Sequence, residues 1–421
     1  MTENHDISQT ILHLCQAARE AAYRVANAST EQKNQALYSM AAAIRQQQDL
    51  ILAANAEDRH RAEQADISPA FLDRLLLNAE RIEAMAASLE AIATLPDPVG
   101  TVLATIERPN GLHIRRVRVP IGVIGVIYES RPNVTADAAG LCLKSGNAVI
   151  LRCGSESFHS ATAILRALQQ GLQAAQLPLS AVQMITTRDR AAVKALLSMD
   201  KYIDVIIPRG GPQLIASIMA ETRIPLFKHL AGICHTYVHQ EADLAMARKI
   251  VFNAKLRRTG ICGATEVLLI DQAIVASHLS GILQDLFAAG CEIRGDQQVV
   301  EFDSRVKLAK ANDYDTEFLA PILAVKIVKD LSQAIAHIAE HGTQHTDAII
   351  TANEQAAQQF LQKVDSAIVI HNASTQFADG GEFGMGAEIG IATGKLHARG
   401  PVGVEQLTTF KYQVQGSGQV R

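Results

Sequence analysis

The feature that most constrains the fold of this chain is an alternation, from about residue 121 onward, of short apolar segments with longer amphipathic ones. The apolar segments predict buried strands at 122–128, 148–152, 182–186 and 202–207. Segments with the apolar spacing of helices follow at 157–177, 190–198 and 212–221. Because helices on both faces of a sheet bury its strands completely, the pattern predicts an α/β fold with a parallel sheet.

A second set of strand-like segments lies further along the chain. These segments are 236–239, 266–270, 322–327, 347–351 and 366–370. Amphipathic segments separate them, so a second α/β unit is predicted. Before the first unit, polar and apolar residues alternate over 102–119, which predicts a hairpin. A lone hairpin is marginal in water, so it must pack on something, and a partner subunit is one candidate.

The N-terminal part of the chain, from residue 7 to about residue 92, is predicted to be helical. Ser29 and Gln32 form a capping box ahead of a run over 31–65. Ser68 and Pro69 have the pattern of an N-cap followed by proline in the first helical turn. We therefore expect a second long helix there, running towards residue 93.

Length, charge and cysteine pattern limit the class of protein. A chain of 421 residues predicts two or three domains. Its net charge of −4 gives no support for binding to nucleic acid or to an anionic membrane. The polar start predicts no signal peptide, and no apolar run approaches the ~18 residues of a membrane span. Six cysteines without a CxxC pair fit neither a disulfide framework nor a zinc site, so we expect a cytoplasmic protein without a metal.

Cys262 is the candidate nucleophile. It lies in NAKLRRTGICGATEVLLI, between a predicted helix and a predicted strand. Nearby cations lower the pKa of a thiol, and three precede it at Lys255, Arg257 and Arg258. Glycines at 260 and 263 leave room for a substrate carbon. The alternative is a buried structural cysteine, and these residues alone do not decide between the two.

Two loops are candidates for ligand binding. The turn Pro208–Arg209–Gly210–Gly211 joins a strand to a helix, where free N–H groups suit a pyrophosphate; the alternative is an ordinary βα turn. No GxGxxG fingerprint follows a strand. The segment Glu129–Ser130–Arg131–Pro132–Asn133 follows the strand 122–128, at a position where open α/β sheets bind ligands. It suits a charged, amino-acid-like substrate, or it is a plain loop.

Taken together, several segments resemble one family. PIGVIGVIYESRPN, GNAVILR, VIIPRGG, KHLAGICHTYV, NAKLRRTGIC and GMGAEIGIATGKLHARGPVGVEQLTTFKY occur here in this order. They are similar to the γ-glutamyl phosphate reductases, also called glutamate-5-semialdehyde dehydrogenases, a branch of the aldehyde dehydrogenase superfamily. The resemblance covers essentially the whole chain, and it favours Cys262 as the nucleophile.

The resemblance implies an aldehyde-dehydrogenase-like fold with two α/β domains of the parallel type and a small β flap. The cofactor domain would comprise 1–104 and 121–232, with 380–404 returning to it. The catalytic domain would be 233–379. The flap would combine 105–120 with 405–421 and join subunits of a homo-oligomer.

The implied reaction is the NADPH-dependent reduction of γ-glutamyl phosphate to glutamate 5-semialdehyde and phosphate, in proline biosynthesis. Cys262 would form a thioester, with Asn133 and the Cys262 N–H as oxyanion donors. Arg152 and the 208–211 turn would contact the cofactor. The residues expected at the substrate are Glu129, Ser130, Arg131, Arg258 and Arg399. A transient contact with glutamate 5-kinase is a further expectation.

One departure from oxidising aldehyde dehydrogenases favours the reductase. Those enzymes have a water-activating glutamate where this chain has His229, in KHLAG. A thioester that is resolved by hydride needs no activated water. His229 is a candidate for proton transfer. Two other activities stay open: a hydrolytic aldehyde dehydrogenase, and a cysteine acyltransferase or amidase without a redox step.

Overall fold

The computed structural model of the chain describes residues 2–65, 69–228 and 231–421. The chain divides into two compact units. Unit 1 comprises Met1–Lys228, Gly384–Gly390 and Val402–Arg421, and unit 2 comprises His229–Phe383 and Ile391–Pro401. Among the helices of the described residues, none is long and apolar enough to cross a membrane.

Unit 1 is built on a parallel sheet of four strands in the order β5-β4-β3-β6. The strands are β3 (Val123–Tyr128), β4 (Ala148–Arg152), β5 (Val182–Met184) and β6 (Val205–Arg209). Helices α6 (Val134–Lys144), α7 (Phe158–Ala174), α8 (Arg190–Leu197) and α9 (Pro212–Glu221) connect or follow them. All six residues of β3 are buried, as expected for a central strand covered on both faces. The chain proceeds outward from β3 to β5 and then returns to the other side of β3, so the strand order reverses between β3 and β6.

The N-terminal helices of unit 1 are shorter than the sequence predicted. They are α1 (Thr2–Ala26), α2 (Thr30–Gln46), α3 (Gln48–Gln64), α4 (Pro69–Leu75) and α5 (Ala79–Thr94). Ser29 caps α2 as predicted, by accepting the N–H of Gln32, but the Gln32 side chain donates to the Ala175 carbonyl and does not complete the capping box. The run over 31–65 breaks at Gln47. The second run also breaks, because Asn78 accepts the N–H of Arg81 and begins a new helix. Ser68 lies outside the described residues.

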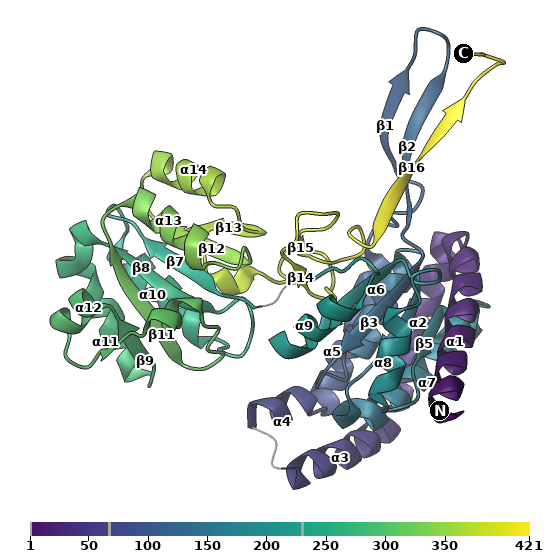
Figure 1. Cartoon of the computed structure of the whole chain (residues 1–421), viewed down its shortest axis with the longest axis horizontal. Helices are drawn as coiled ribbons and strands as arrows, with labels where there is room; N and C mark the ends of the chain where they lie inside the picture. Colours follow the sequence, from purple (N-terminus) through teal and green to yellow (C-terminus); the bar gives the residue numbers. More distant parts are fainter. Residues whose placement is uncertain (1, 66–68, 229–230) are drawn as a thin grey trace. The chain divides into compact units, whose positions relative to one another are not determined.

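A three-stranded antiparallel sheet forms the flap of unit 1. It consists of β1 (Val102–Glu107), β2 (His113–Pro120) and β16 (Thr408–Gln415), in the order β1-β2-β16, and it projects from the rest of the unit (Figure 1). The predicted hairpin therefore pairs with the C-terminal strand of its own chain. Alternate β16 side chains leave one face with exposed apolar groups, at Phe410, Tyr412 and Val414.

Unit 2 contains a parallel sheet of seven strands in the order β10-β9-β11-β8-β7-β12-β13. They are β7 (Cys234–Val238), β8 (Thr265–Asp271), β9 (Glu292–Gly295), β10 (Lys307–Leu308), β11 (Ile322–Val328), β12 (Thr346–Ile350) and β13 (Ile368–His371). The sequence did not predict β9 and β10, which are short and carry charged side chains.

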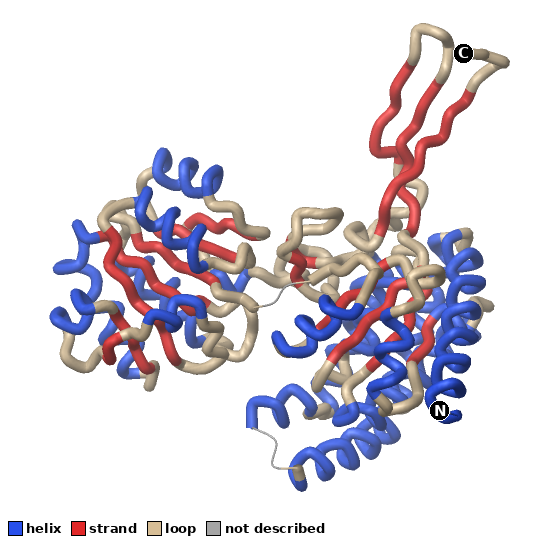
Figure 2. The backbone as a smooth tube through the Cα atoms, viewed as in Figure 1, coloured by secondary structure: helices blue, strands red, loops and turns tan. Residues whose placement is uncertain are grey.

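Helices cover both faces of this sheet (Figure 2). They are α10 (Leu244–Leu256), α11 (Ser280–Ala288), α12 (Gln297–Phe302), α13 (Leu331–His341) and α14 (Glu354–Lys363). Leu268 and Ile270 of β8 pack into one hydrophobic cluster, whereas Val267 and Leu269 pack into another. Because successive residues of a strand point to opposite faces, this division gives unit 2 a core on each side of the sheet.

Near its C-terminal end the chain leaves one unit for the other and then returns. Gly384–Gly390 belongs to unit 1, and the stretch Ile391–Pro401, which pairs β14 (Ile391–Ala392) with β15 (Gly400–Pro401), belongs to unit 2. This differs from the prediction that 380–404 returns as a whole to the first domain. The chain returns to unit 1 at Val402, whose carbonyl accepts the Ile389 N–H and whose N–H donates to the Gly390 carbonyl.

Candidate active site

The six cysteines differ sharply in accessibility. Cys262 is half-buried, and the other five are buried. Burial raises the pKa of the thiol to about 12 in Cys15 and Cys153 and to about 11 in Cys291. Burial also raises the pKa values of Cys142 and Cys234. Because the thiolate is the nucleophilic form, the five buried thiols are inert and Cys262 alone is open to chemistry.

The turn that carries Cys262 is held in place by the buried side chain of Gln376. It joins the end of α10 to the start of β8, so the thiol lies at the amino end of the strand. Gln376, which is buried, donates its side-chain N–H groups to the carbonyls of Asn253 and Ala254, at 3.1 and 2.9 Å. Both carbonyls lie in the last turn of α10, and that of Asn253 also accepts the Arg257 N–H at 3.2 Å. The Gln376 amide thus fixes the point where the chain leaves α10.

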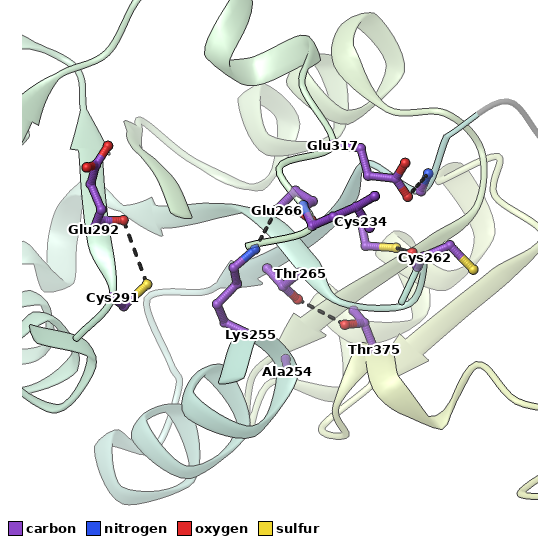
Figure 3. Close-up of polar contacts among 12 residues, drawn as sticks. Cys234, Ala254, Lys255, Cys262, Thr265, Glu266, Cys291, Glu292, Glu317 and Thr375 are labelled. Atoms are coloured by element: carbon purple, nitrogen blue, oxygen red, sulfur yellow. Dashed lines mark hydrogen bonds and ion pairs between the residues drawn. The ribbon is translucent and has the colours of Figure 1, made fainter. Parts of the chain in front are cut away.

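Lys255 does not supply the cation that the sequence predicted beside the thiol. Its Nζ lies 2.5 Å from Oε2 of Glu266, and both side chains are fully buried (Figure 3). Burial raises the pKa of Glu266 to about 7, although the Lys255 ammonium opposes this shift. The charge of Lys255 is therefore paired inside unit 2. Arg257 and Arg258 are exposed on the turn itself.

In unit 1, the carboxyl ends of three strands bring candidate residues to one edge of the sheet. Ile127 of β3 pairs with Arg152 of β4 on one side and with Pro208 of β6 on the other. Glu129 continues β3 at the same level, and its N–H donates to the Arg209 carbonyl at 2.9 Å. This edge lies where the strand order reverses, the position at which open α/β sheets bind ligands.

One backbone donor of the 208–211 turn is already engaged. The Gly211 N–H donates to Oε2 of Glu129 at 3.0 Å. A Cβ at Gly210 would lie 2.4 Å from the same oxygen, so a glycine is needed for the carboxylate to approach. A pyrophosphate oxygen could reach the Gly211 N–H only in place of the Glu129 carboxylate. Glu129, which the sequence predicted at the substrate, contacts this turn.

The residues after Glu129 form a tight, polar bend. Ser130 is buried in a left-handed conformation (φ 58°), and its N–H donates to Oε1 of Glu156 at 2.7 Å. Asn133 donates one amide N–H to Oδ2 of Asp137, at 2.9 Å. Burial raises the pKa of Asp137 to about 6. Arg131 is half-buried beside them. The polar groups of Ser130 and Asn133 therefore bond to residues outside the bend, Glu156 and Asp137.

Arg399, a further residue predicted at the substrate, belongs to unit 2. Arg399 makes two hydrogen bonds to Asp365, one to Oδ1 at 2.7 Å and one to the carbonyl at 2.8 Å. Lys395 also pairs with Asp365. These cations lower the pKa of the Asp365 carboxyl. His229 lies outside the described residues. Within the described residues, no group of three His, Cys, Asp or Glu side chains is arranged to hold a metal ion.

Sequence reasoning missed three residues that hold the Cys262 turn: Gly232, Cys234 and Gln376. The first two contact Cys262 directly. A signal was present, because both lie in KHLAGICHTYV, where a glycine next to a strand indicates a close backbone approach. Nothing local marks Gln376, whose contact with Ala254 spans 122 residues.

Known proteins share this architecture over the whole chain. The sequence model of the aldehyde dehydrogenase family matches residues 5–289. A γ-glutamyl phosphate reductase of Parvibaculum lavamentivorans is 58% identical over 420 residues, which cover 100% of this chain and 99% of that protein. The crystal structure of the Thermotoga maritima γ-glutamyl phosphate reductase superposes with a TM-score of 0.94 at 41% identity, covering 98% of this chain and 99% of that one.

A more distant structure shares the fold alone. The acetylating aldehyde dehydrogenase of Geobacillus thermoglucosidasius has a TM-score of 0.72 at 20% identity and covers 99% of each chain. The predicted fold class is confirmed. The chain belongs to the aldehyde dehydrogenase family and, within it, to the γ-glutamyl phosphate reductases, and it is an oxidoreductase.

Proposed function

We propose that this chain reduces γ-glutamyl phosphate to glutamate 5-semialdehyde and phosphate, with NADPH as the reductant and a thioester on Cys262 as the intermediate. The observation that carries the mechanism is the accessibility of Cys262, the one thiol of the six that is not buried. Full-length similarity to proteins named for this reaction supports the substrate. The proposal places the enzyme in cytoplasmic proline biosynthesis, next to the glutamate 5-kinase reaction.

The thiolate of Cys262 performs the covalent step. Its Sγ attacks the acyl carbon, the bond from that carbon to the phosphate oxygen breaks, and phosphate leaves with the electron pair. Bound NADPH would supply the hydride that converts the thioester to a thiohemiacetal. Collapse of the thiohemiacetal releases the aldehyde and restores the thiolate. Asn133 and the Cys262 N–H stay the proposed donors to the oxyanion.

The edge of the unit 1 sheet fits a dinucleotide. The guanidinium of Arg152 is half-buried at the end of β4 and makes no hydrogen bond or ion pair within the described part of the chain. Such a group is available to a ribose or phosphate oxygen. Gly210 and Gly211 leave the β6–α9 turn open to close approach, and Arg209 adds positive charge. A phosphate at this turn would compete with the Glu129 carboxylate.

One assay separates this function from the two alternatives. In the reverse direction, glutamate 5-semialdehyde with NADP should reduce the cofactor only when phosphate or arsenate is present, because the thioester needs an oxyanion acceptor. Turnover without either anion would contradict the proposal and indicate a hydrolytic dehydrogenase. If no cofactor is reduced under any condition, a cysteine acyltransferase or amidase is the better assignment.

A further inference from the structure

The backbone of Cys262 is held by two residues of the segment that leads into β7. The Cys234 thiol donates to the Cys262 carbonyl, with Sγ and O 3.1 Å apart. Cys234 is fully buried, so water does not compete for its thiol; Nδ1 of His345 lies 3.6 Å from the same sulfur, further away than the carbonyl oxygen. In Figure 3 the Cys234 sulfur is directed at the Cys262 carbonyl, whereas the Cys262 sulfur points away from Cys234.

Gly232 packs closely against the same backbone. A Cβ at Gly232 would lie 2.1 Å from the carbonyl oxygen of Cys262 and 2.7 Å from its Cα. These are backbone atoms that cannot rotate aside, so any side chain at 232 would displace the nucleophile. The Gly232 N–H in turn donates to Oε1 of Glu317 at 2.9 Å. The segment is therefore fixed on its far side as well.

These contacts determine where the reactive sulfur points. The direction of the Cys262 carbonyl fixes ψ at that residue and thus the orientation of its Cα–Cβ bond relative to the sheet. Burial raises the pKa of the Cys234 thiol well above its ordinary value, so that thiol stays protonated and can donate throughout the working pH range. Small displacements of a reacting atom cost large factors in rate.

We infer that Cys234 and Gly232 are positioning residues that clamp the Cys262 backbone and aim its sulfur at the acyl carbon. The inference rests on the role proposed for Cys262, although not on the identity of the substrate. It predicts that loss of the Cys234 donor slows acylation of Cys262 and leaves substrate binding unchanged.

The test is the burst of p-nitrophenol that the full chain releases from p-nitrophenyl acetate without cofactor. Cys234→Ala should slow the burst about threefold to tenfold, the size expected for one lost hydrogen bond, with KM for the acyl phosphate unchanged. Cys234→Ser, which keeps a donor, should restore the burst to within about twofold. The matched control is Cys291→Ala, because Cys291 is also buried in unit 2 but its sulfur faces the Glu292 carbonyl.

A second pair of variants tests the clamp without touching a cysteine. Gly232→Ala should slow the burst more than about tenfold, because the Cys262 backbone must move. Gly281→Ala is the control, since a Cβ there makes an ordinary 3.4 Å contact with Arg248. A cooperative thermal unfolding transition will show that each variant is folded.

Several outcomes would overturn the clamp. One is a wild-type burst rate in folded Cys234→Ala or Gly232→Ala. Equal losses in Cys234→Ser and Cys234→Ala, or in Cys291→Ala, would also refute it, because they point to packing. A burst that persists in Cys262→Ala would show that Cys262 is not the nucleophile. Absence of phosphate-dependent NADP reduction, with the burst pattern as expected, would refute the proposed function alone.

Discussion

At the scale of single residues, accessibility separates Cys262 from the other cysteines more clearly than its sequence neighbours do. The sequence could not decide whether Cys262 was a nucleophile or a structural thiol, because burial depends on contacts that are distant in the chain. Lys255 illustrates the same limit. It lies close to Cys262 in sequence, yet its ammonium pairs with Glu266 of β8 inside the fold. Adjacency in sequence therefore did not predict the partner of the Lys255 charge.

Replacement of Cys262 tests its role directly. We expect Cys262→Ala to abolish turnover, by a factor of at least ~10³, because no other thiol is exposed. NADPH should still bind, since the residues proposed for the cofactor are in unit 1. Steady-state assays and fluorescence titration of NADPH measure the two effects. Full activity in Cys262→Ala would contradict the assignment, and Cys291→Ala provides the control for the loss of a thiol.

Glu129 gives a second prediction at this scale. Glu129→Gln keeps an acceptor for the Gly211 N–H but removes a negative charge from the proposed phosphate site. We expect the Kd for NADPH to fall about threefold to tenfold at low salt, and less at high salt, where charges are screened. Titration at two ionic strengths checks this. Glu221→Gln, at the far end of α9, is the matched control. Weaker binding in Glu129→Gln would show that the carboxylate assists the cofactor.

At the scale of elements, the strands and helices of the two sheets were predictable because their apolar periodicity is strong. The breaks between the N-terminal helices were harder to predict. The break at Gln47 has no side-chain cap that would mark it in the sequence. Strands β9 and β10 were missed because Glu292, Arg294 and Lys307 obscure the apolar pattern. These charged side chains pair with one another, an arrangement that sequence periodicity does not reveal.

We expect the burial of His337 in α13 to make unit 2 sensitive to acid. His337 is buried, and burial lowers its pKa to about 2, with help from the positive charges that His235, Lys326 and His341 can carry. An unfolded histidine titrates near pH 6.5. Between these two pKa values, the unfolded chain binds one more proton at this site than the folded chain does. The free energy of unfolding therefore rises with pH, and it decreases as the pH falls below about 6.5.

The expected loss from His337 is about 1.4 kcal/mol of unfolding free energy per pH unit below pH 6. His337→Phe removes the proton site and keeps an aromatic ring. We therefore expect the melting temperature of this variant to fall less steeply than that of the wild type between pH 7 and pH 5. Calorimetry over this range measures the slopes. Equal slopes would contradict the prediction, and His13→Gln, at an exposed histidine of α1, should not change the slope.

At the scale of the whole molecule, the sequence predicted two α/β units and a flap, but not the route of the chain between them. The stretch Ile391–Pro401 belongs to unit 2 between two stretches of unit 1. Its glycines and short strands carry no periodicity that would assign it to either. The flap was easier to foresee, because its alternating residues predicted a sheet that needed a partner.

The exposed face of the flap predicts self-association. Phe410, Tyr412 and Val414 lie on one face of β16 and are 46%, 57% and 57% exposed. Exposed aromatic and aliphatic groups at this density mark protein contact sites, and we expect a homo-oligomer. Tyr412→Asp should weaken assembly at least ~10-fold, as measured by analytical ultracentrifugation. Lys411→Asp, on the opposite face of the same strand, is the control. A monomeric wild type would refute the expectation.

The pairing of β2 with β16 also has a consequence for biosynthesis. About 290 residues separate the end of β2 at Pro120 from the start of β16 at Thr408. At typical translation rates of ~5–20 residues per second, the ribosome needs roughly 15 to 60 s to make them. During that interval β2 has an unprotected edge, open to strand exchange between nascent chains. The flap sheet of unit 1 is therefore completed only after residues 408–415 have been made, because β16 is its third strand.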